Sequence, residues 1–175
     1  MKYQAHKNFG YRKTRNYLMD TEYRNLVKNI RLRALDLLAL REHTRQELQI
    51  KLEAKFHDKD VISQLLDELE ATYIQSDERY AEMFLRNRVR KGHGPNRIKV
   101  DLNKKGIASE LSHTLLSSGS VDWRRLALTV LQRKCGEKRD LGKTDIARNG
   151  RFLAQRGFST EQIYQAFKDY NNSKQ

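Results

Sequence analysis

The 175-residue chain has a single cysteine and a single proline, and its apolar runs are far shorter than a membrane span. The lone cysteine, Cys135, excludes an internal disulfide and any cluster of cysteine ligands around a metal. It fits a reducing compartment, and the N-terminus lacks the apolar core of a secretion signal. We therefore expect a cytoplasmic protein with no membrane contact. The scarcity of proline, with nine glycines, favours helices.

Motifs for catalysis are also missing. The sequence contains no P-loop, no dinucleotide-binding glycine fingerprint, no H-E-x-x-H zinc pair and no nucleophile elbow. The five histidines are scattered without the spacing of metal ligands. The carboxylates of Asp67, Glu68 and Glu70 are expected on the outer face of a helix, where solvent is their simplest partner. We predict that the protein is not an enzyme and has neither a metal nor a cofactor.

Acidic residues are few relative to basic ones, with 22 Asp and Glu against 35 Lys and Arg and a formal charge of +13. Such an excess implies attraction to polyanions, of which nucleic acid is the leading candidate. The alternative is a ribosome-associated or merely basic protein. With 38% hydrophobic and 33% charged residues, the composition is polar for a compact globular protein and favours an elongated shape.

The segment 76–107 has the most distinctive pattern in the chain. Ser76 is a good N-cap for a helix that ends at Gly92-His93-Gly94, and Pro95 occupies the first position of a second helix. Eight Lys and Arg between residues 86 and 105 accompany one acid, Asp101. This basic two-helix elbow is suited to an anionic partner.

The elbow run R-x-x-K-G-x-G-P-x-R-I-x-x-x-L-x-x-K-G-I resembles the central signature of the RecX family, bacterial regulators of the RecA recombinase. It is formed here by Arg88, Lys91, Gly92, Gly94, Pro95, Arg97, Ile98, Leu102, Lys105, Gly106 and Ile107. Residues 34–48 are similar to the family's opening helix pair, and the similarity extends from about Asn25 to Asp169. The resemblance implies a protein that binds the RecA nucleoprotein filament and reduces its growth, ATP hydrolysis and strand exchange in recombination and DNA repair.

The remaining segments also indicate helices, and they repeat. The motif L-x-x-(K/R) begins at Leu52, Leu102 and Leu153, at spacings of 50 and 51 residues. Three copies at a near-constant period indicate stacked units, each too small to bury its apolar face well. We predict an all-α fold, an elongated array of three tandem three-helix units of helix-turn-helix type, over residues 25–74, 75–120 and 121–171. The first copy has Lys55-Phe56 where the others have glycine, so its second helix is expected to end differently.

Helix starts and the first helix are predicted from local signals. The capping box T-x-x-E at Thr44 and the caps Asp122 and Ser159 each begin a helix, and another helix is expected to start from Asp58. An apolar stripe that should be buried precedes the first cap, formed by Leu26, Ile30, Leu35, Leu37, Leu38 and Leu40. Residues 1–24 are interpreted as a basic, aromatic arm that contacts nucleic acid, packs its aromatic side chains on the domain or has no such role, with a helix start within 14–24 also compatible.

The basic positions carry the functional prediction. We assign nucleic-acid or filament binding to Arg86, Arg88, Arg90, Lys91, Arg97, Lys104, Lys105, Arg124, Arg125, Arg148, Arg151 and Arg156. The elbow structure is assigned to Gly92, Gly94, Pro95 and Gly106. Contacts of cations with phosphates give affinity for single- and double-stranded DNA without base specificity. For Arg97 the alternative is an intrahelical pair with Asp101.

Two other functions stay open at this point. A general, sequence-nonspecific nucleic-acid-binding protein without a recombinase partner has the same charge pattern. A helix-turn-helix transcription factor is weaker, because no single recognition helix combines base-reading residues with a dimerisation segment. We expect a monomer in which Trp123 is a core or docking residue and Cys135 is an inert residue near a helix end. Capping of the filament and insertion into its groove are both compatible with the sequence.

Overall fold

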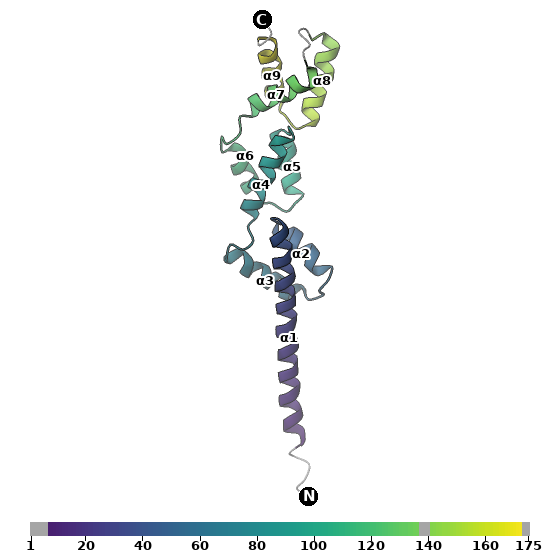
Figure 1. Ribbon diagram of the computed structural model, residues 1–175, viewed down its shortest axis with the longest axis vertical. Coiled ribbons are helices and arrows are strands. Elements are labelled where there is room, and N and C mark those ends of the chain that lie inside the picture. The colour runs from purple at the N-terminus through teal and green to yellow at the C-terminus, as the bar shows by residue number, and fades with distance from the viewer. Residues whose placement is uncertain (1–6, 137–140, 173–175) are drawn as a thin grey trace. The chain divides into compact units, whose positions relative to one another are not determined.

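The computed structural model describes the backbone of residues 7–136 and 141–172, and the side chains of residues 20–136 and 141–172. Every regular element in these ranges is a helix, as Figure 1 shows, which confirms the all-α prediction. The helices are α1 (Lys7–Leu40), α2 (Arg45–Glu53), α3 (Lys59–Ala71), α4 (Asp77–Arg90), α5 (Pro95–Asn103), α6 (Ser109–Ser117), α7 (Trp123–Cys135), α8 (Lys143–Gln155) and α9 (Thr160–Asn172). No helix of the described ranges is both long and apolar enough to cross a membrane.

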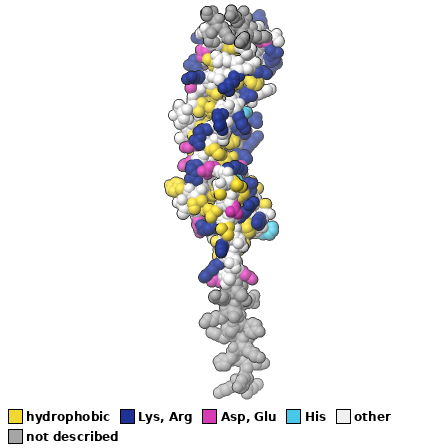
Figure 2. All heavy atoms as spheres, in the orientation of Figure 1, with side chains coloured by type: hydrophobic (Ala, Val, Ile, Leu, Met, Phe, Trp, Pro, Cys, Tyr) yellow, Lys and Arg dark blue, Asp and Glu magenta, His cyan; other side chains and the backbone are white. Residues whose placement is uncertain are grey.

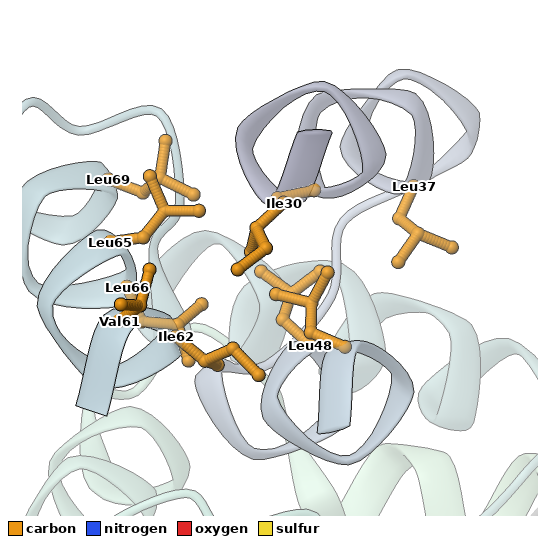
Figure 3. Close-up of a cluster of buried hydrophobic side chains, with 10 residues drawn as sticks. Ile30, Leu37, Leu48, Val61, Ile62, Leu65, Leu66 and Leu69 are labelled. Carbon is orange, nitrogen blue, oxygen red and sulfur yellow. The ribbon is translucent and has the colours of Figure 1, made fainter. Parts of the chain in front are cut away.

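The chain divides into two compact units, Met1–Ser76 and Asp77–Gln175. The first unit packs α2 and α3 against the C-terminal part of α1. Its buried side chains come from all three helices and point toward one another in Figure 3, with Ile30, Leu48 and Ile62 fully buried. The exact bounds of the three predicted units stay a prediction.

The cap predicted at Thr44 is confirmed, and Asp58 caps the helix that was expected to start there. The hydroxyl of Thr44 accepts a hydrogen bond from the Glu47 N–H at 3.0 Å, and the Asp58 carboxylate accepts one from the Val61 N–H at 3.1 Å. Each cap satisfies one of the backbone donors that a helix start leaves without an intrahelical partner. These short-range contacts fix where α2 and α3 begin.

The first helix differs from its prediction in two ways. It begins at Lys7, earlier than the start within residues 14–24 that the sequence suggested, while the role of residues 1–24 as a basic, aromatic arm stays a prediction. The contacts proposed for the side chains of residues 1–19 lie outside the described residues. Leu35 and Leu40 are exposed by 37% and 82%, because the face that packs on α2 and α3 is set by Ile30, Ala34 and Leu37.

The carboxylates of α3 also differ from their prediction. Asp67 and Glu70 both pair with Arg45, at 2.6 and 3.2 Å, and Glu68 pairs with Arg31 of α1. The acids are exposed, as predicted, but their partners are arginines of the first and second helices rather than solvent alone. Exposed pairs of this kind contribute little stability, typically about 0–1 kcal/mol each.

The second unit contains two apolar clusters. One is formed by α4–α6 around Tyr80, Ile98 and Leu102, and the other by α7–α9 around Leu131 and Tyr170. The two clusters are the cores of two three-helix domains within one compact unit.

Trp123 begins α7 yet packs against the α4–α6 cluster, and its indole N–H donates to the Leu116 carbonyl at 3.2 Å. The prediction of a core or docking residue is therefore confirmed. Cys135, at the other end of α7, is half-buried, and its sulfur accepts a hydrogen bond from the buried Asn149 amide.

The ends of the repeated second helices follow their glycines. In α5 and α8, Gly106 and Gly157 adopt φ of 81° and 90°, and the next residue bonds back to the carbonyls of Leu102 and Leu153 at 3.2 Å in each case. These are the bonds of a Schellman C-cap. In α2, Phe56 bonds to the Leu52 carbonyl at 2.8 Å, one residue earlier in the repeat. The first copy ends differently, as predicted, because no glycine is present to adopt the left-handed conformation.

Candidate nucleic-acid interface

The predicted elbow is the connection between α4 and α5. After α4 ends, Gly92 adopts a φ of 72°, and the N–H groups of Gly92 and His93 bond back to carbonyls of the last turn at 2.9 and 3.0 Å. Gly94 is the extended N-cap of α5, with a φ of −83°, and Pro95 follows at the first helical positions. The turn predicted from G-x-G-P is confirmed.

The elbow is also a joint between the two domains of the second unit. The Gly94 N–H donates to the Arg156 carbonyl at 2.8 Å, and the Asn96 N–H donates to the Gly157 carbonyl at 3.1 Å. A Cβ added to Gly94 would lie 2.5 Å from the Gly157 backbone, and a Cβ added to Gly157 would lie 2.3 Å from the backbone nitrogen of Arg97. Both positions therefore require glycine, because two backbones approach closely here.

Arg156 strengthens the same joint. Its Nη1 donates to the carbonyl oxygens of Lys91 at 2.7 Å and Gly92 at 3.2 Å, and its guanidinium lies 4.8 Å from the centre of the Phe152 ring. These carbonyls belong to the end of α4, where helix geometry leaves acceptors without intrahelical donors. The structure thus places this predicted binding residue in a link between domains.

Two further predicted residues share a carboxylate. Arg88 and Arg97 contact opposite oxygens of Asp101 at 3.2 and 3.3 Å, and the Asp101 side chain is only 11% exposed. Arg88 also lies over the Phe84 ring, 4.7 Å from its centre. The intrahelical pair considered for Arg97 is therefore present, and Arg88 extends it across the elbow from α4 to α5.

The remaining predicted cations point outward. Lys105 is the exception and is half-buried. The other eight are exposed and lie on or beside α4, α5, α7 and α8: Arg86, Arg90, Lys91, Lys104, Arg124, Arg125, Arg148 and Arg151. On the face drawn in Figure 2, Lys and Arg side chains recur among hydrophobic ones. Their protein partners are weak or local, such as Glu82 at 3.7 Å from Arg86, and Asp145 at 2.5 Å from Arg148.

His93 lies inside the elbow and has a lowered pKa. Burial is the main cause, and the positive charges of Arg88 and Arg156 add to it. Its Nδ1 is buried and has no hydrogen-bond partner among the described residues. The imidazole is therefore neutral near pH 7, and it adds no positive charge to a joint that already contains three arginines.

A groove runs beside α4 in the second unit. It has a volume of about 860 Å³ and is lined by apolar side chains such as Met83, Val89 and Leu115, together with Arg86 and Arg90. Sequence reasoning did not find this groove, because its other wall comes from α6 and the loop before α7. On α4, Arg86, Val89 and Arg90 share one face at spacings of three and four residues, so this wall of the groove could be anticipated from the sequence. An apolar groove with arginines is suited to a protein surface.

Comparisons with known proteins agree with the repeats. Family models described as the first, second and third three-helix domains of RecX match residues 31–69, 76–114 and 123–167. The chain also resembles the crystal structure of RecX from Lactobacillus salivarius, with a TM-score of 0.76 and 22% identity over 85% of this chain and 98% of that one.

Curated relatives extend the match over most of the sequence. Proteins called regulatory protein RecX are 37% identical in Halorhodospira halophila and 40% identical in Pseudomonas putida, each over 134 residues. These matches span 77% of this chain in both cases, and 83% and 86% of the respective relatives. The chain therefore belongs to the RecX family of regulatory proteins.

Proposed function

We propose that this RecX-family protein modulates the RecA recombinase by binding the RecA–DNA nucleoprotein filament, where it limits filament growth, ATP hydrolysis and strand exchange. The observation that carries the proposal is the joint at Gly94 and Gly157. Its backbone hydrogen bonds of 2.8 and 3.1 Å connect α4–α6 with α7–α9, so the cations of both domains belong to one body. A body with fixed charge spacing is suited to a regular polymer such as a filament.

The DNA component of binding is assigned to the eight exposed cations. Among the described residues, only Arg148 pairs with a largely buried carboxylate, that of Asp145, which is 18% exposed, so the other seven are available to a phosphate at small cost. Contacts of this kind do not read bases, and they accept single- and double-stranded DNA. We expect the protein to act as a monomer in the bacterial cytoplasm, where the recombinase works.

The protein component is assigned to the groove beside α4. Its lining combines five apolar side chains and two arginines with Glu82, Asn87 and two serines, and methionine and arginine are among the residues enriched in protein interfaces. A RecA protomer in this groove would hold the second unit against the filament while neighbouring cations contact the DNA. Binding of both at once would obstruct the addition of protomers or loosen the contacts between them.

RecA-catalysed ATP hydrolysis on single-stranded DNA tests the proposal. The wild-type chain should inhibit it at concentrations well below those that cover the DNA. Replacing Arg86 and Arg90 by glutamine removes cations that lie at the groove, and we expect the inhibitory concentration to rise about tenfold. Lys28→Gln with Lys51→Gln removes the same charge from exposed positions of the first unit and is the matched control.

A protein that binds only nucleic acid would give a different result in this assay. A general nucleic-acid-binding protein would inhibit only when it covers the DNA, and its inhibition would be equally weakened by both double variants. That result would replace the proposed recombinase partner by DNA alone. The arginines at the joint are unsuitable for this test, since Arg88, Arg97 and Arg156 also support the fold.

A further inference from the structure

A small pocket of about 270 Å³ lies at the joint, where the C-terminal ends of α4, α7 and α8 come together. Four cations line it: Lys91 after α4, Arg133 and Lys134 in the last turn of α7, and Arg156 after α8. No carboxylate is among its described lining residues. Arg133 and Lys134 are not among the site residues predicted from the sequence.

The cations are gathered more closely than the helix ends require. A helix C-terminus carries about half a negative charge, so three of them offset roughly one and a half of the four positive charges. Two of the cations also converge on one ring, with Lys134 Nζ 5.3 Å and the Arg156 guanidinium 4.8 Å from the centre of Phe152. Like charges that line one small pocket repel, and a bound anion would relieve that repulsion.

We propose that this pocket binds one phosphate group of a nucleic-acid backbone. Ammonium and guanidinium groups are the side chains that match phosphate oxygens best. The pocket is smaller than the roughly 300–1,000 Å³ typical of small-molecule sites, which fits a phosphate better than a whole nucleotide. Because the Phe152 ring already contacts two cations, base stacking is not the mode of recognition.

The inference rests on the proposed function for its ligand, the DNA of the filament, and it adds a consequence for the joint. A phosphate in the pocket would contact residues from both domains of the second unit, namely Lys91 on one side and Arg133 and Lys134 on the other. Its binding would therefore hold α4–α6 and α7–α9 together more firmly. DNA binding and rigidity of the second unit are coupled in this arrangement.

The test uses bare oligothymidylate without RecA, and fluorescence anisotropy across a range of salt concentrations. Arg133→Gln with Lys134→Gln removes two pocket cations from exposed positions, so the fold should survive. We expect the slope of log affinity against log salt to fall in magnitude by about one. Lys143→Gln with Lys168→Gln removes the same charge from exposed positions outside the pocket and should leave the slope within error of wild type.

A second arm separates free phosphate from the phosphodiester, using Trp123 fluorescence during thermal unfolding. Inorganic phosphate should raise the melting temperature of the wild-type chain above that in chloride of equal ionic strength, and should have no such effect on the pocket variant. The same melts report whether each variant folds.

An unchanged salt slope in the folded pocket variant would overturn the proposal. If oligoglutamate competes for the pocket while the DNA slope is unaffected, the ligand is an acidic protein segment, which also overturns it. A response to inorganic phosphate alone would leave only a small-anion site and would count against a nucleic-acid ligand. These measurements contain no RecA, so they test the pocket independently of the proposed function. Failure of the wild-type chain to inhibit RecA would refute only the proposed function.

Discussion

Gly157→Ala should loosen the joint between the two domains of the second unit. Gly157 has a φ of 90°, a conformation that alanine adopts only with strain. An added Cβ would also lie 2.3 Å from the backbone nitrogen of Arg97 and 2.4 Å from its Cβ. Neither neighbour is the flexible end of a side chain, so the two backbones must separate.

The expected cost is the sum of two effects. Strain in the left-handed region costs about 1–2 kcal/mol for a residue with a Cβ. Separation of the backbones breaks the two hydrogen bonds that cross the joint, from Gly94 and Asn96, at about 0.5–1.5 kcal/mol each. The free energy of unfolding of the second unit should therefore fall by about 2–5 kcal/mol.

Two other glycines separate these effects. Gly119 has a φ of 75° and no atom within 4 Å of its added Cβ, so Gly119→Ala should cost only the strain, about 1–2 kcal/mol. Gly94 has an ordinary φ of −83° but meets the Gly157 backbone at 2.5 Å, so Gly94→Ala should cost mainly the steric part. The single tryptophan, Trp123, lies in the second unit, and its fluorescence in a urea titration reports that unit's unfolding.

The order of the three variants decides the matter. Gly157→Ala must be the most destabilising, because it alone combines strain with a clash. If it costs no more than Gly119→Ala, the backbones of the elbow and of the turn before α9 are not in close contact, and the joint described above does not exist in solution.

Three further changes test other parts of the fold. Leu102→Ala removes a fully buried side chain and should cost about 2–5 kcal/mol in the same urea titration, whereas Val100→Ala, at a 49% exposed position of the same helix, should cost far less. Thr44→Ala removes the cap of α2 and should cost about 1 kcal/mol, measured by circular dichroism on heating, and no change would contradict the capping contact. Burial lowers the pKa of His43 and His93 below the ordinary value of 6.5, so the unfolded chain binds protons first as the pH falls. The free energy of unfolding should be highest above pH 6.5 and decline as the pH falls below it. His43→Gln with His93→Gln should show a flatter dependence of this free energy on pH in urea unfolding.

The sequence predicts the helices well where their ends depend on local chemistry. The caps Thr44, Asp58 and Asp122 satisfy N–H groups three residues ahead, so the signal and its effect lie in the same short stretch. The start of α1 has no such signal, and the prediction placed it too late. The exposure of Leu40 was also missed, since which face of a helix is buried depends on where its neighbours pack.

The candidate site was less predictable because it joins distant segments. The elbow glycine Gly94 and the helix-ending Gly157 each have an ordinary local explanation, as a turn and a C-cap. Their contact with each other needs the packing of α7 against the α4–α6 cluster, which Trp123 makes. For the same reason, charge counting found the arginines of the joint but could not tell which carbonyl or carboxylate each one contacts.

The contacts of these arginines limit how steeply DNA binding can depend on salt. Each cation that displaces a counterion from single-stranded DNA contributes about 0.7 to the slope of log affinity against log salt. Arg88 and Arg97 already contact Asp101, and Arg156 is held by backbone carbonyls, so binding phosphates would require them to exchange one partner for another. The eight exposed cations of the predicted set can together contribute a slope of about 6, and the pocket residues Arg133 and Lys134, which share a single phosphate, about 0.7 more. A measured slope well beyond about 7 would have one of two causes: further cations of the chain join the interface, or the joint opens when DNA binds. Gly157→Ala distinguishes these causes, because it opens the joint before DNA binds. The variant should change the slope only if opening of the joint is the cause.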